Sequence, residues 1–255
     1  MRIGNGTIRL HESQAMIYYL ERRDLHREAV LKQIYDDMAH HYYWSDDFSE
    51  AMYIDLADAG FISVSIVHEG RLLLLGEIQQ AYAILAFERM HVGRNVSKLL
   101  RKARHRLAFN TAFDTVLSSI QASYEDCWMV GEYAELMRRL SSAGDARFRL
   151  FSTELYDDDT DMLVAGEIGY TTANGVYTSL SGFHNRERRY RNWGKLQLVL
   201  LGRHLQNSGM RFWNLGHPQM KYKIDLGARI VSRRDFLRLW YDGFAVRGRT
   251  GPFLS

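Results

Sequence analysis

The chain has few cysteines, which can cross-link a fold, and few prolines, which interrupt helices and strands. Its 255 residues include one cysteine, Cys127, and two prolines. A single cysteine excludes an intrachain disulfide and any cysteine-rich zinc site. No apolar run approaches the roughly 18 residues of a membrane span, and the polar N-terminal residues are not typical of a signal peptide. We therefore expect a cytoplasmic protein that has no membrane partner, no metal and no cofactor.

Acidic residues are almost missing from two stretches, although the net charge is only +3. The stretch between Glu88 and Asp114 has none, and the stretch between Glu167 and Asp225 has one Glu against nine Lys or Arg. The basic residues of these stretches include Arg94, Lys98, Arg101, Lys102, Arg188, Arg189, Arg191 and Lys195. Segregation of this kind favours a phosphate-binding face, with solvated helix surfaces as the alternative interpretation.

The first half of the chain has mixed helical and strand periodicity. Apolar spacing predicts one amphipathic helix over residues 12–39, and Ser49 is a plausible cap for a helix that ends at Gly60. Strands are expected at residues 61–67, 72–75 and 80–88, and further helices at 92–103, 111–123 and 131–143.

The second half has a clearer order. Three strands at residues 147–156, 162–171 and 176–183 are followed by helix 194–207, strand 211–215, helix 219–226, strand 229–231 and helix 233–241. This order resembles the GNAT acyltransferase fold, whose fourth and fifth strands separate to admit the acyl donor. We expect an α+β fold with a mixed, mostly antiparallel sheet flanked by helices in residues 111–255. A smaller N-terminal α/β domain, with the amphipathic helix, a small sheet and the basic helix, is expected in residues 1–110.

Motifs spread along the chain carry a family resemblance. They are SDDFSEAMYIDLADAGFIS (45–63), HVGRNVSKLLRKARHRL (91–107), FNTAFDTVLSSIQAS (109–123) and LGARIVSRRDFLRL (226–239). In their order and spacing, from about residue 45 to 242, the chain resembles the leucyl/phenylalanyl-tRNA–protein transferases. The resemblance implies a reaction that moves an amino acid from the 3′ end of its tRNA to the N-terminal amine of a protein or peptide.

Several site residues follow from the resemblance. The tRNA-contacting basic stretch of the family falls on Arg94, Lys98, Arg101 and Lys102, and the second basic stretch is expected to help. The tryptophan beside the terminal adenosine falls on Trp128. The methionine of the apolar amino-acid pocket falls on Glu167, and the glutamate at the pocket floor falls on Ser181. A carboxylate in a formerly apolar pocket needs a cationic partner, which could be a basic aminoacyl side chain, the α-amino group of either substrate, or a nearby arginine of the protein. If Glu167 faces the pocket, the donor is expected to be an amino acid other than leucine or phenylalanine. The alternative is that Glu167 lies on the outer face of its strand.

The stretch FWNLGHP, residues 212–218, ends an apolar strand in polar groups. The Asp and Gln that the family places near the reacting groups fall on Asn214 and on Gly216 or His217. Asn214 can orient an amine or a carbonyl, and a histidine can accept a proton near neutral pH. We therefore name Asn214 and His217 as candidate catalytic residues, with a histidine satisfied by a backbone carbonyl as the alternative for His217.

Two other functions stay open at the level of the sequence. Arg191-Asn192-Trp193-Gly194-Lys195-Leu196 matches part of the Gln/Arg-x-x-Gly-x-Gly/Ala signature of acetyl-CoA enzymes, whose amides cradle a pyrophosphate at a helix N-terminus. An acyl-CoA-dependent N-acyltransferase is therefore an alternative. The altered Asp, Gln and Glu positions also allow a non-catalytic relative that binds tRNA.

Overall fold

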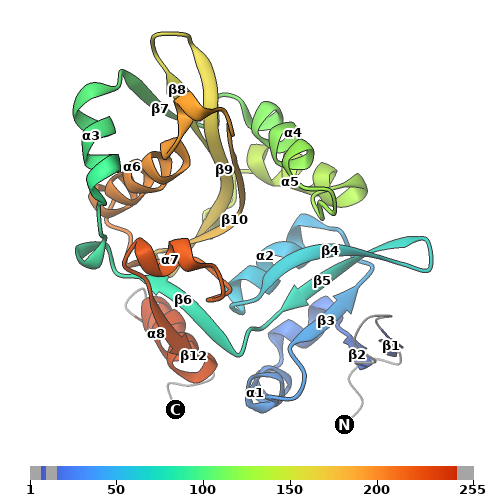
Figure 1. Cartoon of the computed structure of the whole chain (residues 1–255). Helices are drawn as coiled ribbons and strands as arrows, with labels where there is room; N and C mark the ends of the chain where they lie inside the picture. Colours follow the sequence, from blue (N-terminus) through green and yellow to red (C-terminus); the bar gives the residue numbers. More distant parts are fainter. Residues whose placement is uncertain (1–6, 10–15, 246–255) are drawn as a thin grey trace.

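The structure is a computed structural model that describes residues 7–9 and 16–245 (Figure 1). The described residues form a smaller sheet of five strands and a larger sheet of seven. Helices flank both sheets, so the α+β class predicted from the sequence is confirmed. No helix among residues 16–245 is both long and apolar enough to cross a membrane.

The smaller sheet is built from the first 77 residues. Its strands, in spatial order, are β1 (Thr7–Arg9), β2 (Met16–Tyr19), β3 (Tyr42–Ser45), β5 (Arg71–Glu77) and β4 (Ile62–His68). Between β4 and β5 the chain turns at Glu69 and Gly70, whose φ angles of 49° and 75° suit a tight hairpin. Helix α2 (Glu50–Asp58) packs on β4, and the predicted Ser49 cap is confirmed, because its Oγ accepts a hydrogen bond from the Met52 amide at 3.1 Å.

The single helix predicted over residues 12–39 is wrong in its described part. Residues 16–19 form β2, a 3₁₀ helix η1 (Arg22–His26) follows, and only α1 (Glu28–Asp36) is α-helical. Tyr18 and Tyr19 pair in parallel with Tyr43 and Trp44 of β3. Aromatic residues fit a half-buried strand, and this pairing outweighs their helical spacing. Residues 12–15 lie outside the described part of the chain.

The larger sheet has the strand order that the sequence predicts for its second half. In space it runs β12 (Arg229–Ser232), β6 (Ala81–Leu85), β11 (Phe212–Asn214), β10 (Val176–His184), β9 (Met162–Thr172), β8 (Phe148–Asp157) and β7 (His105–Phe109). Strands β8, β9 and β10 are antiparallel, and β11 runs parallel to β10. This is the arrangement expected of a GNAT-like sheet, except that β6 lies between β11 and β12.

The chain passes from the smaller sheet to the larger one at residues 78–80, and the domain boundary near residue 110 stays a prediction. Strand β6 and strand β7 both belong to the larger sheet, and the basic helix α3 (Arg94–Lys102) between them packs on helix α6 (Trp193–Asn207). Strand β7 was not predicted. Its sequence, HRLAF, begins with two polar residues and does not alternate clearly. It forms an edge strand that pairs with β8 from His105 to Phe109.

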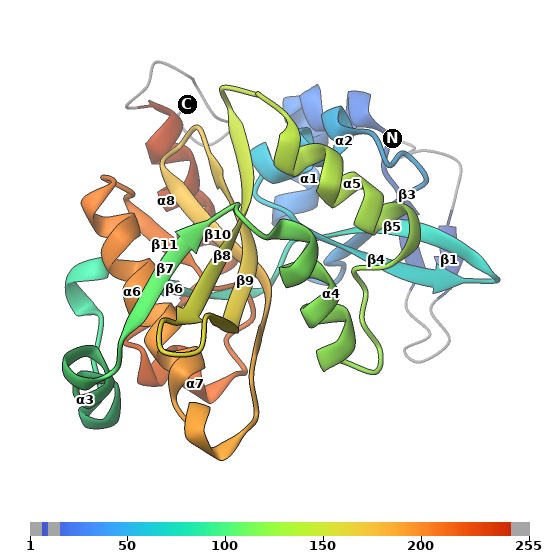
Figure 2. The ribbon, with the colours of Figure 1, turned by 90° about the horizontal axis from the view of Figure 1, so that it is seen from above.

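Helices cover both faces of the larger sheet. Figure 2 shows α4 (Phe113–Ser123) and α5 (Gly131–Ser142) on one side of β8–β10, and α6 with α3 on the other. The core on the α4 side is continuous with that of the smaller sheet, because Tyr53 of α2 packs edge-on against Phe148 and Tyr170. The two sheets therefore share one hydrophobic core.

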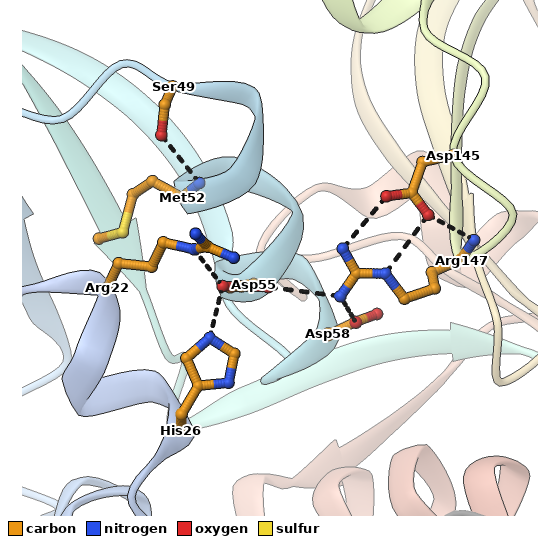
Figure 3. Close-up of polar contacts among 8 residues, drawn as sticks. All are labelled: Arg22, His26, Ser49, Met52, Asp55, Asp58, Asp145 and Arg147. Carbon is orange, nitrogen blue, oxygen red and sulfur yellow. Dashed lines mark hydrogen bonds and ion pairs between the residues drawn. The ribbon is translucent and has the colours of Figure 1, made fainter.

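Asp55 of α2 links the N-terminal segment to the larger sheet (Figure 3). Its buried carboxylate accepts hydrogen bonds from Arg22 Nε at 2.6 Å and from His26 Nε2 at 2.7 Å. Arg147, just before β8, reaches the same carboxylate at 3.5 Å and is held by Asp145 at 3.1 Å. A buried carboxylate needs such partners, and here they come from segments more than 120 residues apart in sequence (Arg22 to Arg147).

Arg233 closes the junction between the sheets. Its guanidinium is buried at the start of α8 (Arg233–Ala245) and donates hydrogen bonds to backbone carbonyls only. The acceptors are Ile78 O at 2.8 Å, Gln79 O at 3.0 Å, Asp37 O at 2.5 Å and Ile34 O at 3.4 Å. One side chain thus ties α8 to the end of α1 and to the link between β5 and β6.

We expect Arg233→Met to destabilise the fold strongly. Removal of the guanidinium leaves up to four buried carbonyls without a donor, so the free energy of unfolding should fall by about 3 kcal/mol or more. Urea unfolding followed by circular dichroism measures this change. The control is Arg234→Met, which removes the same charge from the exposed neighbouring position. Equal stability of the two variants would contradict this role of Arg233.

Candidate active site at the end of strand β11

Strands β10 and β11 pair over a short distance and then separate. Val176, Tyr177 and Thr178 pair with Phe212, Trp213 and Asn214, and β10 continues to His184 without β11 beside it. On its other edge the chain stays paired with β6, where the Leu215 amide donates to Ala83 O at 2.9 Å. The stretch FWNLGHP therefore lies where the two parallel strands part.

Asn214 shapes the turn that follows β11. Its side chain is buried, its Oδ1 accepts from the Gly216 amide at 3.0 Å, and its Nδ2 donates to Thr178 Oγ1 at 3.4 Å. Gly216 has a φ of +69°, a conformation that favours glycine. Both ends of the Asn214 amide are thus used within the protein, which makes it a residue that positions the turn.

Lys223 holds the same turn from the other side, and it is not among the site residues predicted from the sequence. It lies on the short helix α7 (Lys221–Asp225), and its ammonium donates to Leu215 O at 2.5 Å and to His217 O at 2.7 Å. Burial lowers the pKa of Lys223 to about 8. In sequence it was one of nine basic residues in its stretch, and nothing local distinguishes a buried lysine from an exposed one.

His217 reaches across to the smaller sheet. Its Nε2 lies 2.8 Å from Oε1 of Glu77, the last residue of β5, and about half of its side chain is exposed. The Glu77 carboxylate is buried, and Oε1 has no hydrogen-bond donor. At this distance the imidazole and the carboxylate interact electrostatically, although the ring N–H does not point at Oε1. The alternative prediction was a hydrogen bond from the His217 ring to a backbone carbonyl. No such hydrogen bond is found in the described residues.

Glu167 lies on the α6 face of β9 and is not on an outer surface. Its carboxylate is buried and accepts hydrogen bonds from Tyr177 Oη at 2.8 Å, Ser179 Oγ at 2.9 Å and Gln197 Nε2 at 3.3 Å. Burial raises the pKa of Glu167, and these three donors oppose the rise. The hydrogen-bond donors found for it in the described residues are neutral, so the arginine partner considered from the sequence is not found.

The other two pocket residues lie apart from the turn. Ser181 is half-buried on β10, beyond an irregularity in the pairing with β9 between Ser179 and Ser181. Trp128 is half-buried between α4 and α5, where its ring packs edge-on against Tyr133 and its carbonyl accepts a hydrogen bond from Ser65. No contact described in residues 16–245 joins Trp128 to Asn214 or His217.

The basic residues of α3 form an exposed surface without acidic partners in the described residues. Arg94, Lys98, Arg101 and Lys102 line a surface hollow together with Asn95. By contrast, the next arginines along the chain are paired, Arg104 with Asp159 at 3.5 Å and Arg106 with Asp161 at 2.7 Å. The α3 surface is therefore the part of this stretch with uncompensated positive charge.

In the second basic stretch, only some of the basic side chains lack a salt bridge within the described residues. Arg188 and Arg191 are exposed and form no salt bridge in the described part of the chain, whereas Arg189 pairs with Glu187 at 2.9 Å and Lys195 with Asp225 at 3.8 Å. A hollow of about 320 Å³ between α3, α6 and α7 is lined by His91, Gly93, Lys195 and Tyr222, among others. The first turn of α6 thus lies beside the N-terminal end of the basic helix.

We expect Lys223→Met to remove a pH-dependent part of the stability. The pKa of Lys223 is about 8 in the folded chain, whereas a lysine in an unfolded chain titrates near 10.4. The unfolded state therefore binds more protons between these values, so wild-type stability should rise relative to the variant as pH increases through that window. Urea unfolding at about pH 7.5, 9 and 10.5 measures the difference. Lys221→Met, at an exposed position of α7, is the control, and a pH-independent difference for Lys223→Met would contradict the assignment.

Comparisons with known proteins identify the family. The model of the leucyl/phenylalanyl-tRNA protein transferase family matches residues 84–241. The leucyl/phenylalanyl-tRNA–protein transferase of Chromohalobacter salexigens is 31% identical over 157 residues, which cover 60% of this chain and 57% of that protein. That of Pseudomonas syringae pv. tomato is 28% identical over 156 residues, covering 60% and 63%. The solved structure of FemX covers 89% of this chain and 81% of its own, at 10% identity and a TM-score of 0.48.

The chain spans about three-fifths of the length of these two transferases. The match includes both candidate catalytic residues, Glu167, Trp128 and the basic helix, since all lie within residues 84–241. Because the family model matches well over half of the chain, the chain belongs to the leucyl/phenylalanyl-tRNA protein transferase family.

Proposed function

We propose that this chain transfers an aminoacyl group from aminoacyl-tRNA to the N-terminal amine, or another primary amine, of a protein or peptide. The observation that carries the proposal is the uncompensated basic surface of α3, in a chain that belongs to a family named for such a reaction. Phosphate contacts would hold the acceptor stem of the tRNA without reading much sequence. Because the donor is charged tRNA, the proposed place of action is the cytoplasm.

The chemistry needs little besides positioning and one proton acceptor. The donor ester is already reactive toward a neutral amine, so the protein has to place the amine nitrogen against the ester carbonyl carbon. The amine nitrogen attacks this carbon, the bond from the carbon to the ribose oxygen breaks, and the ribose oxygen takes up a proton. The products are an amide and a tRNA with a free 3′-terminal ribose.

In this proposal His217 accepts the proton that the attacking ammonium must lose. Its ring is half-exposed at the point where β10 and β11 separate, and the Glu77 carboxylate 2.8 Å away would stabilise the imidazolium that forms. Asn214 and Lys223 act as positioning residues, because they hold the turn through Gly216, Leu215 and the His217 carbonyl.

Glu167 supports a donor other than leucine or phenylalanine. The three hydrogen bonds from neutral donors leave one of the four lone-pair directions of its carboxylate unused. A buried carboxylate beside a purely apolar side chain is unfavourable, whereas a polar or cationic donor side chain could use this direction. We therefore propose that Glu167 contributes to an altered donor specificity. In this proposal Ser181 and Trp128 bind the same donor substrate.

An acyl-CoA donor is less well supported. The space beside Gly194 at the start of α6, where a pyrophosphate would approach, is bordered by the His184 side chain, 3.1 Å from where a Cβ on Gly194 would be. The Leu196 amide is also already bonded to Asn192 O at 2.9 Å. A cradle of free amides is therefore not favoured at this helix end.

We expect binding of uncharged tRNA to depend steeply on salt, and α3 to carry much of this dependence. Replacing Arg94, Lys98, Arg101 and Lys102 together by Ala should lower the slope of log affinity against log salt by about 3 in magnitude. Filter binding over a salt series measures the slope. Arg106→Ala is the matched control, because Asp158 and Asp161 already compensate that charge. An unchanged slope in the fourfold variant would remove α3 from the tRNA surface.

The proposed reaction is tested by label transfer. We would mix the protein with tRNA charged separately with each radiolabelled amino acid and with peptides that bear different N-termini. The expected result is label on peptide from one or a few charged tRNAs, with His217→Gln lowering the rate roughly 100-fold. Salt-dependent tRNA binding without transfer from any charged tRNA would indicate a non-catalytic relative. Neither transfer nor binding would reject the tRNA proposal and direct the assay to acyl-CoA donors.

A further inference from the structure

Three buried side-chain polar atoms without a hydrogen-bond partner in the described residues lie at the junction of the two sheets. They are Oε1 of Glu77, Oε1 of Gln79 and Nδ1 of His41, which is an acceptor in the tautomer protonated at Nε2. Glu77 and Gln79 are only 5% and 3% exposed. A buried acceptor without a partner is costly, so a group of them in one place requires an explanation.

Backbone pairing and side-chain contacts bring these acceptors together. The Ile78 amide donates to His41 O at 2.9 Å, and Tyr42 pairs with Glu77 across β3 and β5. Gln79 donates through Nε2 to Glu77 Oε2 at 3.4 Å, which leaves the Gln79 oxygen as its unused end. The cluster formed by His41, Glu77 and Gln79, called the acceptor cluster below, thus lies where β3 begins and β5 ends, and the pairing of these strands fixes its position.

The acceptor cluster lies against the turn after β11. A Cβ on Gly216 would be 3.6 Å from Gln79 Nε2, and His217 Nε2 is 2.8 Å from Glu77 Oε1. His217 is half-exposed and lies beside the cluster. Any group bound by the cluster would therefore lie next to the proposed proton acceptor.

The chemistry of the cluster selects its ligand. A carboxylate, an amide oxygen and an imidazole nitrogen accept hydrogen bonds, and the carboxylate adds a negative charge. Burial lowers the pKa of His41, and Arg233 and His217 lower it further against the opposing effect of Glu77, which favours the neutral ring. The nearby Arg233 is committed to backbone carbonyls and does not donate to these atoms. An anion is excluded, and a group with several N–H donors and a positive charge fits.

A metal ion fits less well than an ammonium group. Among residues 7–9 and 16–245 there is no group of three or more His, Cys, Asp or Glu side chains arranged to hold one. A primary ammonium offers several N–H donors for the Gln79 oxygen and the His41 nitrogen, and a positive charge that matches the Glu77 carboxylate.

We propose that Glu77, Gln79 and His41 form a binding site for the primary ammonium group of a substrate, with the acceptor's N-terminal amine as the group it holds. The assignment rests on the proposed transfer function. The ammonium bonds to Gln79 and His41 and gives its third proton to the ring of His217, which stays against Glu77, and the Glu77 carboxylate stabilises the imidazolium. The neutral amine, still bonded to Gln79 and His41, then attacks the ester carbonyl. Glu77 and Gln79 are thus substrate-binding residues contributed by the smaller sheet.

The test uses a peptide and its Nα-acetylated twin, with no tRNA present. Calorimetry should show the wild-type chain binding the free amine at least about tenfold more tightly than the acetylated peptide, a difference of about 1.4 kcal/mol. Glu77→Gln and Gln79→Met should abolish this preference. The matched control is Gln80→Met, because Gln80 is exposed, one position away, and donates instead to Met38 O at 3.0 Å. Thermal melting and salt-dependent tRNA binding confirm that each variant is folded.

A second arm distinguishes the two sources of a primary amine. The same variants are tested for binding aminoacyl-tRNA and N-acetylaminoacyl-tRNA, since the donor also carries an α-amino group. A preference for the free amine in the donor arm alone would assign the site to the donor and overturn the acceptor assignment. Equal binding of free and acetylated forms in both arms would overturn the ammonium site altogether.

The outcomes separate this inference from the proposed function. If label transfer occurs but Glu77→Gln and Gln79→Met leave KM for the peptide unchanged, the ammonium site is wrong and the transferase stands. If the free amine is preferred and the variants abolish that preference, yet no charged tRNA donates, the ammonium site stands and the transfer function is wrong.

Discussion

A buried guanidinium organises the place where the two sheets meet. Arg233 carries a charge that water no longer solvates, and backbone carbonyls from residues 34, 37, 78 and 79 replace the water. Two of these carbonyls belong to the link between β5 and β6, the segment that carries Gln79 and follows Glu77. The position of the acceptor cluster relative to β11 therefore depends on the hydrogen bonds that Arg233 donates to the backbone of this link. A neutral side chain at position 233 could not satisfy these carbonyls.

The candidate active site is assembled from both sheets because β6 inserts next to β11. Strand β11 is only three residues long and lies between β10 and β6, and beyond Asn214 the chain leaves β10 while it stays paired with β6. The loss of pairing with β10 opens the sheet on one side, and the turn that follows brings His217 to Glu77. The turn between them is held by Asn214, by the conformation of Gly216 and by Lys223. A proton acceptor on such a turn has little freedom to reorient except at its own ring, which suits a reaction that depends mainly on positioning.

Charge is divided between two parts of the molecule with different tasks. The α3 surface is positive and largely unpaired, which suits a polyanion that must be held without sequence readout. The buried polar groups around Glu167 and Glu77 are negative or neutral, which suits amines and polar side chains. Lys223 and Arg233 are buried cations in this region, and their hydrogen bonds to backbone carbonyls explain why they are tolerated there. Asn214, His217 and Glu167 lie in the second part.

Local sequence patterns determined most elements of this fold, including the hairpin at Glu69-Gly70, the Ser49 cap, the three-stranded meander and the basic helix, because each depends on neighbours within a few residues. The same patterns led to FWNLGHP and to the uncompensated charge of α3. Only the tertiary structure decided that residues 16–19 form a strand, because their partner lies in β3, and that β6 and β7 join the larger sheet. It also decided which face Glu167 occupies and that Lys223 is buried among carbonyls. These features depend on contacts between segments distant in sequence, and the burial and electrostatic energy of a side chain is set by those contacts and not by its neighbours along the chain.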